Sequence, residues 1–274
     1  MDSRENFFWI DAFTDRPFGG NPAAVCLVEA WPTVSVMQGL AAETALSETA
    51  FIKRSGDDFQ IRWFTPTVEL GLVGHATLAA AYAVMHHVEP GRERVNFAYR
   101  DGVIAASRVG DDIAIELPAD TVRPVPASPD LCAGLGVTPV ATYDGRHHIA
   151  VLASPHEVAA IVPNHEVLSR LTLPTIAVTA PGDDCDYVLR FFAPRNGVPE
   201  DPVSGVAQCS LVPLWSQRLG AEAMLSRQLT PRGAFMRCTL LATSVLVAGP
   251  CSPIFRGNVD TSLLRQRGKS ITPQ

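Results

Sequence analysis

The sequence predicts a mixed α/β protein built from two copies of one domain. The chain has 274 residues, a length that suits two packed domains of about 100–150 residues each. A strand–loop–glycine–helix pattern occurs twice, and extended runs follow a recurring tight turn. Because 47% of the residues are hydrophobic, the chain can bury a sizeable core in each domain.

The recurring turn is the tripeptide Gly-Asp-Asp, at residues 56–58, 110–112 and 182–184. The runs that follow it read FQIRWF, IAIELP and CDYVLRFF. Gly and Asp favour tight turns, and the runs are rich in β-branched or aromatic residues with partial alternation, so each site predicts a hairpin or a strand entry. We therefore assign the acidic pairs to turn chemistry.

The repeat relates two stretches separated by about half of the chain. The matched segments are IRWFTP (61–66) with LRFFAP (189–194), and GHATLAAAYAV (74–84) with GVAQCSLVPLW (205–215). Each copy predicts a strand, a proline-containing loop, a glycine and a helix. In this alignment Gly74 corresponds to Gly205, and His75 corresponds to Val206. A period of this size indicates two similar domains rather than a solenoid of short repeats.

The two predicted helices differ in composition. The first, ATLAAAYAVMHHV at 76–88, consists of good helix formers with little polar surface, so we expect it to be buried. The second contains Pro213, which is expected to shorten or kink it.

The proline-rich segment 118–130 is the expected linker between the domains. We therefore expect an N-terminal domain over residues 1–120 and a C-terminal domain over residues 121–274. The polar tail RQRGKSITPQ (265–274) is expected to fray. Whether the tail from about residue 255 packs back on the first domain stays open.

Charge and hydropathy exclude several partners. The 22 basic and 28 acidic residues give a net charge of −6, and no long basic run occurs. This balance argues against nucleic acid or an anionic membrane surface as a partner. The N-terminus lacks the apolar stretch of a signal peptide, and no run approaches the 18 apolar residues of a membrane span. We therefore expect a cytoplasmic protein.

Cofactor and metal motifs are absent from the sequence. The six cysteines include no C-x-x-C pair, so free thiols are expected. The His-His pairs at 86–87 and 147–148 could touch a metal, but we favour surface or strand histidines, and we expect no metal site. Neither G-x-G-x-x-G nor a Walker A sequence occurs. The sequence therefore predicts a small-molecule substrate and no cofactor.

The two glycine-to-helix junctions are candidate anion sites. A helix N-terminus offers unpaired N–H groups and a partial positive charge, and glycine allows a ligand to approach the backbone closely. Two such termini could converge between the domains and bind a carboxylate or stabilise developing negative charge. Alternatively, Gly74 and Gly205 only permit close packing of helix on strand.

Two carboxylates lie near these junctions in the sequence. Glu48, in ALSETAFI (45–52), lies within an apolar frame that suits a general base. Asp201, in EDPVSG (200–205), lies four residues before Gly205. A capping glutamate and an ordinary Asp-Pro loop are the alternative interpretations.

Several segments together resemble one known family. They are DAFTDRPFGGNPAAVCLV (11–28), LSETAFI (46–52), RWFTPTVELGLVGHATLAAA (62–81), FFAPRNGVPEDPVSG (191–205) and LWSQRLG (214–220). The chain resembles the PhzF-type isomerases, named for phenazine biosynthesis, over nearly its whole length. The resemblance implies the diaminopimelate-epimerase-like fold: two pseudo-symmetric domains, each a curled, mostly antiparallel sheet around a central helix. It also implies cofactor-free proton transfer and a homodimer.

The resemblance also implies roles for individual residues. Glu48 is the expected proton-shuttling base, and His75 and Asp201 are expected to hold and polarise the substrate. Gly74 and Gly205 are expected to supply backbone N–H groups. Ser47 and Asn21 are weaker candidates, because Ser47 adjoins the glutamate and Asn21 could serve only to order its turn.

The sequence departs from the superfamily at three of its expected substrate-binding positions. Racemases of the superfamily carry one thiol immediately before each glycine, where this chain has Val73 and Ser204. Valine cannot carry a proton, so two-thiol racemisation is disfavoured. Val206 stands where the family commonly has serine, and RQLTPRGAFM (227–236) matches only loosely. These changes favour a bulkier or more apolar substrate.

We therefore expect an isomerase that shifts a double bond in a small, unsaturated, carboxylate-bearing compound of secondary metabolism, such as antibiotic biosynthesis. A dihydroaromatic amino acid and an unsaturated pyrroline-carboxylate are two options. A hydrolase or lyase on the same scaffold and a non-catalytic small-molecule binding protein are the alternatives.

Overall fold

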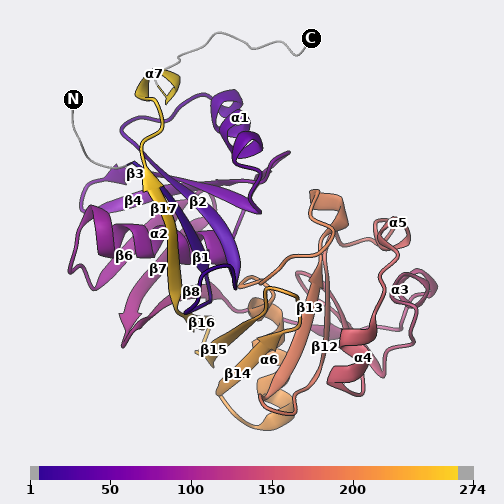
Figure 1. Ribbon diagram of the computed structural model, residues 1–274. Coiled ribbons are helices and arrows are strands. Elements are labelled where there is room, and N and C mark those ends of the chain that lie inside the picture. The colour runs from indigo at the N-terminus through magenta and orange to yellow at the C-terminus, as the bar shows by residue number, and fades with distance from the viewer. Residues whose placement is uncertain (1–5, 265–274) are drawn as a thin grey trace, which may run out of the picture. The chain divides into compact units, whose positions relative to one another are not determined.

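The chain folds into two compact units (Figure 1). The computed structural model describes residues 6–264. Of these, unit 1 contains residues 6–18, 22–115 and 250–264, and unit 2 contains residues 19–21 and 116–249. The C-terminal strand, yellow in Figure 1, lies among the indigo strands of unit 1 because it pairs along the first strand of the chain.

Unit 1 is built on one mixed sheet with the strand order β17–β1–β2–β3–β4–β6–β7. Its strands are β1 (Phe7–Ala12), β2 (Asn21–Val28), β3 (Glu48–Ser55), β4 (Asp58–Phe64), the short β5 (Glu69–Leu70) beside β4, β6 (Arg94–Tyr99), β7 (Gly102–Val109) and β17 (Cys251–Gly257). β2 runs parallel to β3, and β4 runs parallel to β6, whereas β3 and β4 form an antiparallel hairpin. Gly56 closes that hairpin with φ +62°, so the predicted Gly-Asp-Asp turn is confirmed there.

Helix α1 (Val34–Thr44) makes the crossover between the parallel strands β2 and β3. The side chain of Thr33 caps its first turn by accepting from the N–H of Val36. The helix ends at Ala45, which is left-handed with φ +51° and donates its N–H to the carbonyl of Ala41. The reversal at Ala45 brings the chain to the start of β3, which is Glu48.

Helix α2 (Gly74–Ala83) connects the parallel strands β4 and β6 and continues into a π-helical turn, η1 (Val84–Val88). Nine of its ten residues are buried, as its alanine-rich sequence predicts. The helix contacts β1, β3, β7 and β17, strands from across the whole sheet. The sheet of unit 1 therefore curls around α2, and the expected central helix is confirmed.

The strands of unit 2 pair in the order β9–β10–β11–β12–β13–β14–β15–β16, again with mixed directions. Its strands are β9 (Arg123–Pro124), β10 (Ala141–Asp144), β11 (His148–Val151), β12 (Ile176–Pro181), β13 (Tyr187–Phe192), β14 (Ala223–Gln228), β15 (Ala234–Leu240) and β16 (Ser244–Gly249). Here β11 is parallel to β12, and β13 is parallel to β14. The central helix α6 (Gln208–Leu219) contacts β14, β15 and β16.

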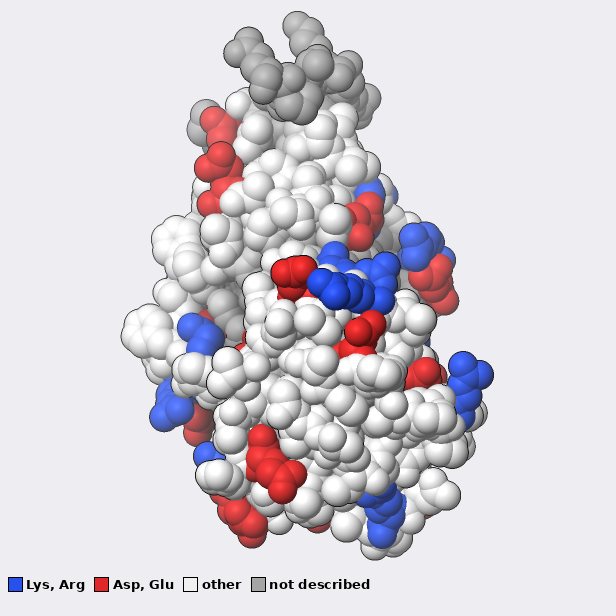
Figure 2. All heavy atoms as spheres, turned by 90° about the vertical axis from the view of Figure 1, so that its right-hand side faces the viewer, with Lys and Arg blue, Asp and Glu red and all other residues white. Residues whose placement is uncertain are grey.

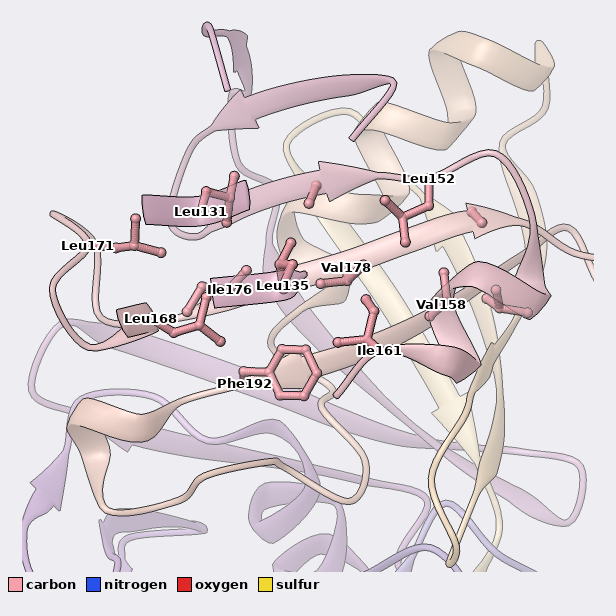
Figure 3. Packing of buried hydrophobic residues seen from close by; sticks show 13 residues of the cluster. Leu131, Leu135, Leu152, Val158, Ile161, Leu168, Leu171, Ile176, Val178 and Phe192 are labelled. Atoms are coloured by element: carbon pink, nitrogen blue, oxygen red, sulfur yellow. The ribbon is translucent and has the colours of Figure 1, made fainter. Parts of the chain in front are cut away.

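Three short helices cover the other face of this sheet (Figure 3). They are α3 (Pro129–Leu135), α4 (Pro155–Ala160) and α5 (His165–Leu168). Ile176 and Val178 alternate along β12 and point to the same face, where Leu168 and Leu135 pack against them (Figure 3). The opposite face of β12 presents Thr179, whose hydroxyl accepts from the indole N–H of Trp215 on α6.

The remaining described elements are β8 (Asp112–Pro118), a single 3₁₀ turn η2 (Pro194–Asn196) and α7 (Thr261–Leu264). Charged groups pair within each unit, as in the pairs Arg62–Glu69 and Arg190–Glu200. On the face in Figure 2, basic and acidic side chains likewise stand among many uncharged residues.

The division of the chain differs from the expected one at its boundary, and the C-terminal segment, whose place the sequence leaves open, belongs to unit 1. The first boundary lies at 115/116, within β8, instead of 120/121. The expected linker, 118–130, is part of unit 2, because its backbone pairs there: the N–H of Val125 donates to the carbonyl of Thr142. Residues 250–264 return to unit 1 through β17. The fraying expected of residues 265–274 concerns residues outside the described part.

The second central helix also differs from its prediction. It begins at Gln208 instead of directly after Gly205, because residues 205–207 form a turn with short-range bonds such as Cys209 N–H to Val206 O. Pro213 does not shorten it, since the helix runs on to Leu219. The carbonyl of Cys209, which proline leaves without a helical donor, accepts the N–H of Asp120 instead.

Candidate active site

Unit 1 brings Glu48 and His75 together. Glu48 is the first residue of β3 and is 7% exposed, and His75 is the second residue of α2 and is 2% exposed. The carboxylate oxygen Oε2 lies 2.8 Å from the imidazole Nε2. A carboxylate and an imidazole held at this distance, away from bulk water, can exchange a proton with each other or with a molecule bound beside them.

The start of β3 is fixed by its neighbours. Glu48 stands opposite Ala23 of β2 in the parallel register. The hydroxyls of Thr44 and Thr49 lie 3.0 Å apart, which ties the end of α1 to the strand beside Glu48. Ser47 precedes the glutamate and is half-buried. These contacts hold the carboxylate on a rigid strand end.

The N-terminus of α2 has no side-chain cap. The residue before it, Val73, is buried and extended, and it makes no side-chain cap hydrogen bond. Thr77 donates its hydroxyl to the carbonyl of Val73 at 2.5 Å, so it leaves the N–H groups alone. The first N–H groups of a helix point away from the helix body, and in α2 these begin with Gly74. The feature suits a bound carboxylate or enolate-like anion.

Unit 2 brings Asp201 and Asn21 together. The amide Nδ2 of Asn21 donates to Asp201 Oδ1 at 2.6 Å and to the carbonyl of Val203 at 2.9 Å. Asn21 is fully buried, and its Oδ1 has no hydrogen-bond partner among the described residues. Asn21 therefore does more than order its own turn, because it orients the Asp201 carboxylate.

A second set of contacts fixes the loop from Asp201 to Ser204. Gln228, at the end of β14, donates from Nε2 to the carbonyl of Asp201 at 2.6 Å and accepts the N–H of Ser204 at 2.8 Å. Thr230 donates its hydroxyl to the carbonyl of Pro202. Ser204 Oγ accepts the N–H of Ala207 and so caps the turn that leads into α6. Residue by residue, the loop is held in place by side chains.

Arg232 holds the chain on the other side of Asn21. Its guanidinium donates to the carbonyls of Gly19 and Gly20 at 2.7 and 2.8 Å. Sequence reasoning did not single out Gln228, Thr230 or Arg232. All three lie in the stretch 227–236, whose loose match to the family was the available signal.

Comparison with known proteins identifies the family. The family described as phenazine biosynthesis-like protein matches residues 10–248. The chain belongs to this phenazine biosynthesis-like family. An uncharacterized isomerase of Pseudomonas aeruginosa is 41% identical over 258 residues, covering 93% of this chain and 98% of the relative.

Solved structures agree with the fold. A PhzF-family protein of Enterococcus faecalis superposes with a TM-score of 0.88 at 35% identity, covering 92% of this chain and 98% of the other. A probable proline racemase from Agrobacterium radiobacter shares the fold, with a TM-score of 0.66 at 10% identity and 95% of each chain covered. The expected family and fold class are confirmed, and the relatives support an isomerase of the PhzF type.

The cysteines lie away from the positions before the two glycines, and three of them, Cys26, Cys209 and Cys238, are buried. Residues 73 and 204 are Val and Ser, and all six cysteines are free thiols elsewhere. Burial raises the pKa of Cys26, Cys209 and Cys238 to about 12, so these three thiols stay protonated and unreactive at neutral pH. The residues present at the two thiol positions cannot perform two-thiol racemisation.

No metal or membrane feature emerges from residues 6–264. Among them, no group of three or more His, Cys, Asp and Glu side chains is arranged to hold a metal ion. Over the same stretch, no helix is both long enough and apolar enough to cross a membrane.

Proposed function

We propose that this protein is a cofactor-independent isomerase that shifts a double bond by proton transfer in a small, unsaturated, carboxylate-bearing substrate. The single observation that carries the proposal is the buried Glu48–His75 pair, with 2.8 Å between Oε2 and Nε2, at the uncapped N-terminus of α2. The start of β3 and the start of α2 together supply a base, a hydrogen-bonding partner and a site for negative charge.

The reaction begins with the ionised carboxylate of Glu48. It removes a proton from a carbon next to a conjugated C=C or C=N system, and the electron pair of the broken C–H bond delocalises over that system. His75 and the N–H groups of the first turn of α2 stabilise the resulting anion. The protonated Glu48 then returns the proton to another carbon of the same system. Atoms and charge balance, and the double bond has moved.

One carboxylate can serve both steps when the two carbons lie on the same face of the substrate. Glu48 therefore holds the removed proton between the two steps. In a fraction of turnovers, this same proton returns to the product. A positioned acid–base group contributes roughly 10²–10⁴-fold to the rate, and positioning and electrostatics supply the rest.

Asp201 serves the same reaction as a substrate-holding group, with proton donation as its alternative role. The hydrogen bond from Asn21 orients the Asp201 carboxylate, and a carboxylate is suited to bind a substrate ammonium or N–H. This complementarity favours a cyclic amino acid as substrate. A dihydroaromatic amino acid and an unsaturated pyrroline-carboxylate both carry the required carboxylate, nitrogen and conjugation.

The test is incubation of the protein in D₂O with a panel of such compounds, followed by mass spectrometry and NMR. An isomerase yields a product of the same mass apart from deuterium at the new C–H position. A product of lower mass indicates a hydrolase or lyase, and the absence of both exchange and product indicates a binding protein.

Substitution of Glu48 identifies the base. Glu48→Gln keeps the shape of the side chain and is expected to lower turnover by about 10³-fold or more, because the amide cannot accept the proton. Glu43→Gln, on the exposed side of α1, is the matched control and retains full turnover. Substantial activity in Glu48→Gln rejects the assignment.

A further inference from the structure

Unit 2 contains a buried imidazole, that of His147, at the place that corresponds to the Glu48–His75 pair of unit 1. His147 is 3% exposed and lies immediately before β11. Its Nδ1 lies 2.6 Å from the hydroxyl of Thr175, which is 6% exposed, and its Nε2 lies 3.4 Å from the carbonyl of Val206. The ring edge of Phe191 packs against it at 4.9 Å between centroids.

The strand registers show that Thr175 of unit 2 occupies the position that Glu48 has in unit 1. In unit 1, Thr49 stands opposite Phe64, and in unit 2, Ile176 stands opposite Phe192, the repeat partner of Phe64. The residue before each is Glu48 in unit 1 and Thr175 in unit 2.

The neighbouring parallel strand extends the match. Ala23 faces Glu48, whereas His148 faces Ile176, so the residue one step earlier, His147, takes the place of Ala23 beside Thr175. With His75 matched to Val206, unit 2 keeps an imidazole near the start of its central helix, but it comes from the sheet instead of the helix.

The partners define the tautomer of His147. A carbonyl oxygen only accepts, so Nε2 carries the proton and donates it to Val206. Nδ1 of the neutral ring is then the acceptor for the Thr175 hydroxyl. Burial lowers the pKa of His147 to about 4, which keeps the ring neutral at pH 7. The side chain thus forms a hydrogen-bond chain in which Thr175 donates to the imidazole and the imidazole donates to the carbonyl of Val206.

We propose that His147 is a positioning residue that fixes the turn 205–207, so that its backbone N–H groups can bind the carboxylate or the developing negative charge of the substrate. The inference rests on the proposed function. Within the turn and the first turn of α6, the carbonyls of Gly205 and Val206 accept only short-range bonds, from Gln208 and Cys209 at 3.2 and 3.1 Å, whereas Ala207 also accepts from Leu211 at 3.0 Å. Ser204 holds one side of it through the N–H of Ala207, and His147 holds the carbonyl of Val206.

The test compares His147→Leu with His147→Gln. Leucine fills the space without a donor, whereas the glutamine amide can still donate to the Val206 carbonyl. In ¹⁵N-labelled protein, we expect the backbone amide signals of Gly205 and Val206 to move in the leucine variant, while those of Gly74 and His75 in unit 1 stay in place. Loss of one such bond corresponds to roughly tenfold in rate, so kcat is expected to fall about tenfold with KM changing less than threefold. The glutamine variant restores kcat to within about threefold.

Unchanged amide signals in His147→Leu, or an equal loss of kcat in both variants, overturns the proposal. If the leucine variant does not fold, Thr175→Val with Thr175→Ser as control tests the same link, since only valine removes the hydroxyl. Movement of the Val206 amide signal in the valine variant alone supports the link, and no movement overturns it. The amide signals need no substrate, so a wild-type protein that converts no panel compound rejects the proposed function without deciding the role of His147.

Discussion

The two units share one topology and differ in the chemistry placed on it. In both, a parallel pair (β2–β3, β11–β12) is followed by an antiparallel pair, a second parallel pair (β4–β6, β13–β14) and another antiparallel pair. Each second parallel pair is connected by a central helix, α2 or α6. At matched positions, unit 1 has Glu48 and His75, whereas unit 2 has Thr175 and Val206. At these matched positions, unit 1 alone carries an acid–base pair, which is the arrangement that the proposed one-carboxylate reaction needs.

The two central helices also differ in composition and in the contacts that hold them. α2 is alanine-rich and carries no charged residue. α6 instead buries Gln208, which accepts from the hydroxyl of Tyr187 at 2.5 Å, and Ser210, which donates to Asp120 at 2.8 Å. Polar links therefore hold α6 in unit 2, whereas α2 is packed by buried apolar residues and has a polar link at its start, from Thr77 to the carbonyl of Val73. One scaffold can therefore use its buried polar groups for the proposed chemistry in one copy and for positioning in the other.

After Glu48→Gln, the largest expected effect comes from making the helix start of unit 1 resemble that of unit 2. His75→Val places in unit 1 the residue that unit 2 has at this position, so the fold should be retained. Glu48 then loses its partner at 2.8 Å, and turnover of the best panel compound should fall about 10²-fold or more. Circular dichroism checks the fold, and initial rates check the loss. Turnover within threefold of wild type would remove His75 from the mechanism. Val206→Ala is the matched substitution in unit 2.

The next largest effect is the dependence of stability on pH that His147 causes. The pKa of His147 is lowered to about 4 by burial, against about 6.5 in an unfolded chain. Between these values the unfolded state binds more protons than the folded one, so the free energy of unfolding rises with pH across this window. From pH 7 to pH 4.5, His147 alone is expected to account for a loss of about 2–3 kcal/mol. Urea titrations at both pH values check this, with His147→Gln as control. An equal loss in both proteins contradicts a neutral, buried His147.

Sequence patterns predicted the repeat, the buried α2 and the glycine turns because each depends on local chemistry. Turn residues and helix formers act within a few positions of themselves. The pairing of Asn21 with Asp201 could not be predicted in this way, since 180 residues separate them. The start of α6 was predicted two residues too early, because the turn at 205–207 has a partner far away in the sequence, His147, which lies just before β11. The boundary within β8 and the return of β17 likewise follow from strand pairing.

The polar support of unit 2 predicts the third effect. Asn21→Ala removes both donors, and it leaves Asp201 Oδ1 and the Val203 carbonyl without the bonds at 2.6 and 2.9 Å. Each buried group left unsatisfied costs about 1–3 kcal/mol, and partial solvation of half-buried Asp201 reduces its share. We expect the free energy of unfolding to drop by about 2 kcal/mol in urea titration. Gln217→Ala, on the exposed end of α6, should change it by less than about 0.5 kcal/mol. A drop in Asn21→Ala no larger than in this control means that the network does not support the unit.

The smallest effects contrast a helical glycine in each unit. A Cβ added at Gly39, on the exposed side of α1, meets nothing within 4 Å. Gly39→Ala should therefore stabilise unit 1 by about 0.5–1 kcal/mol, because alanine loses less backbone entropy in a helix than glycine does.

At Gly134 in α3, the same Cβ would lie 2.5 Å from Cδ2 of Leu168, inside the core of Figure 3. Gly134→Ala gains the same helix propensity, but Leu168 must move, and overpacking of this kind costs about 1–3 kcal/mol. The net result should be destabilisation of about 1 kcal/mol, opposite in sign to that of Gly39→Ala. Thermal unfolding of the two variants measures both signs. If both variants are stabilised, Leu168 can change its rotamer without cost. The core around Leu168 is then less tightly packed than the 2.5 Å approach implies.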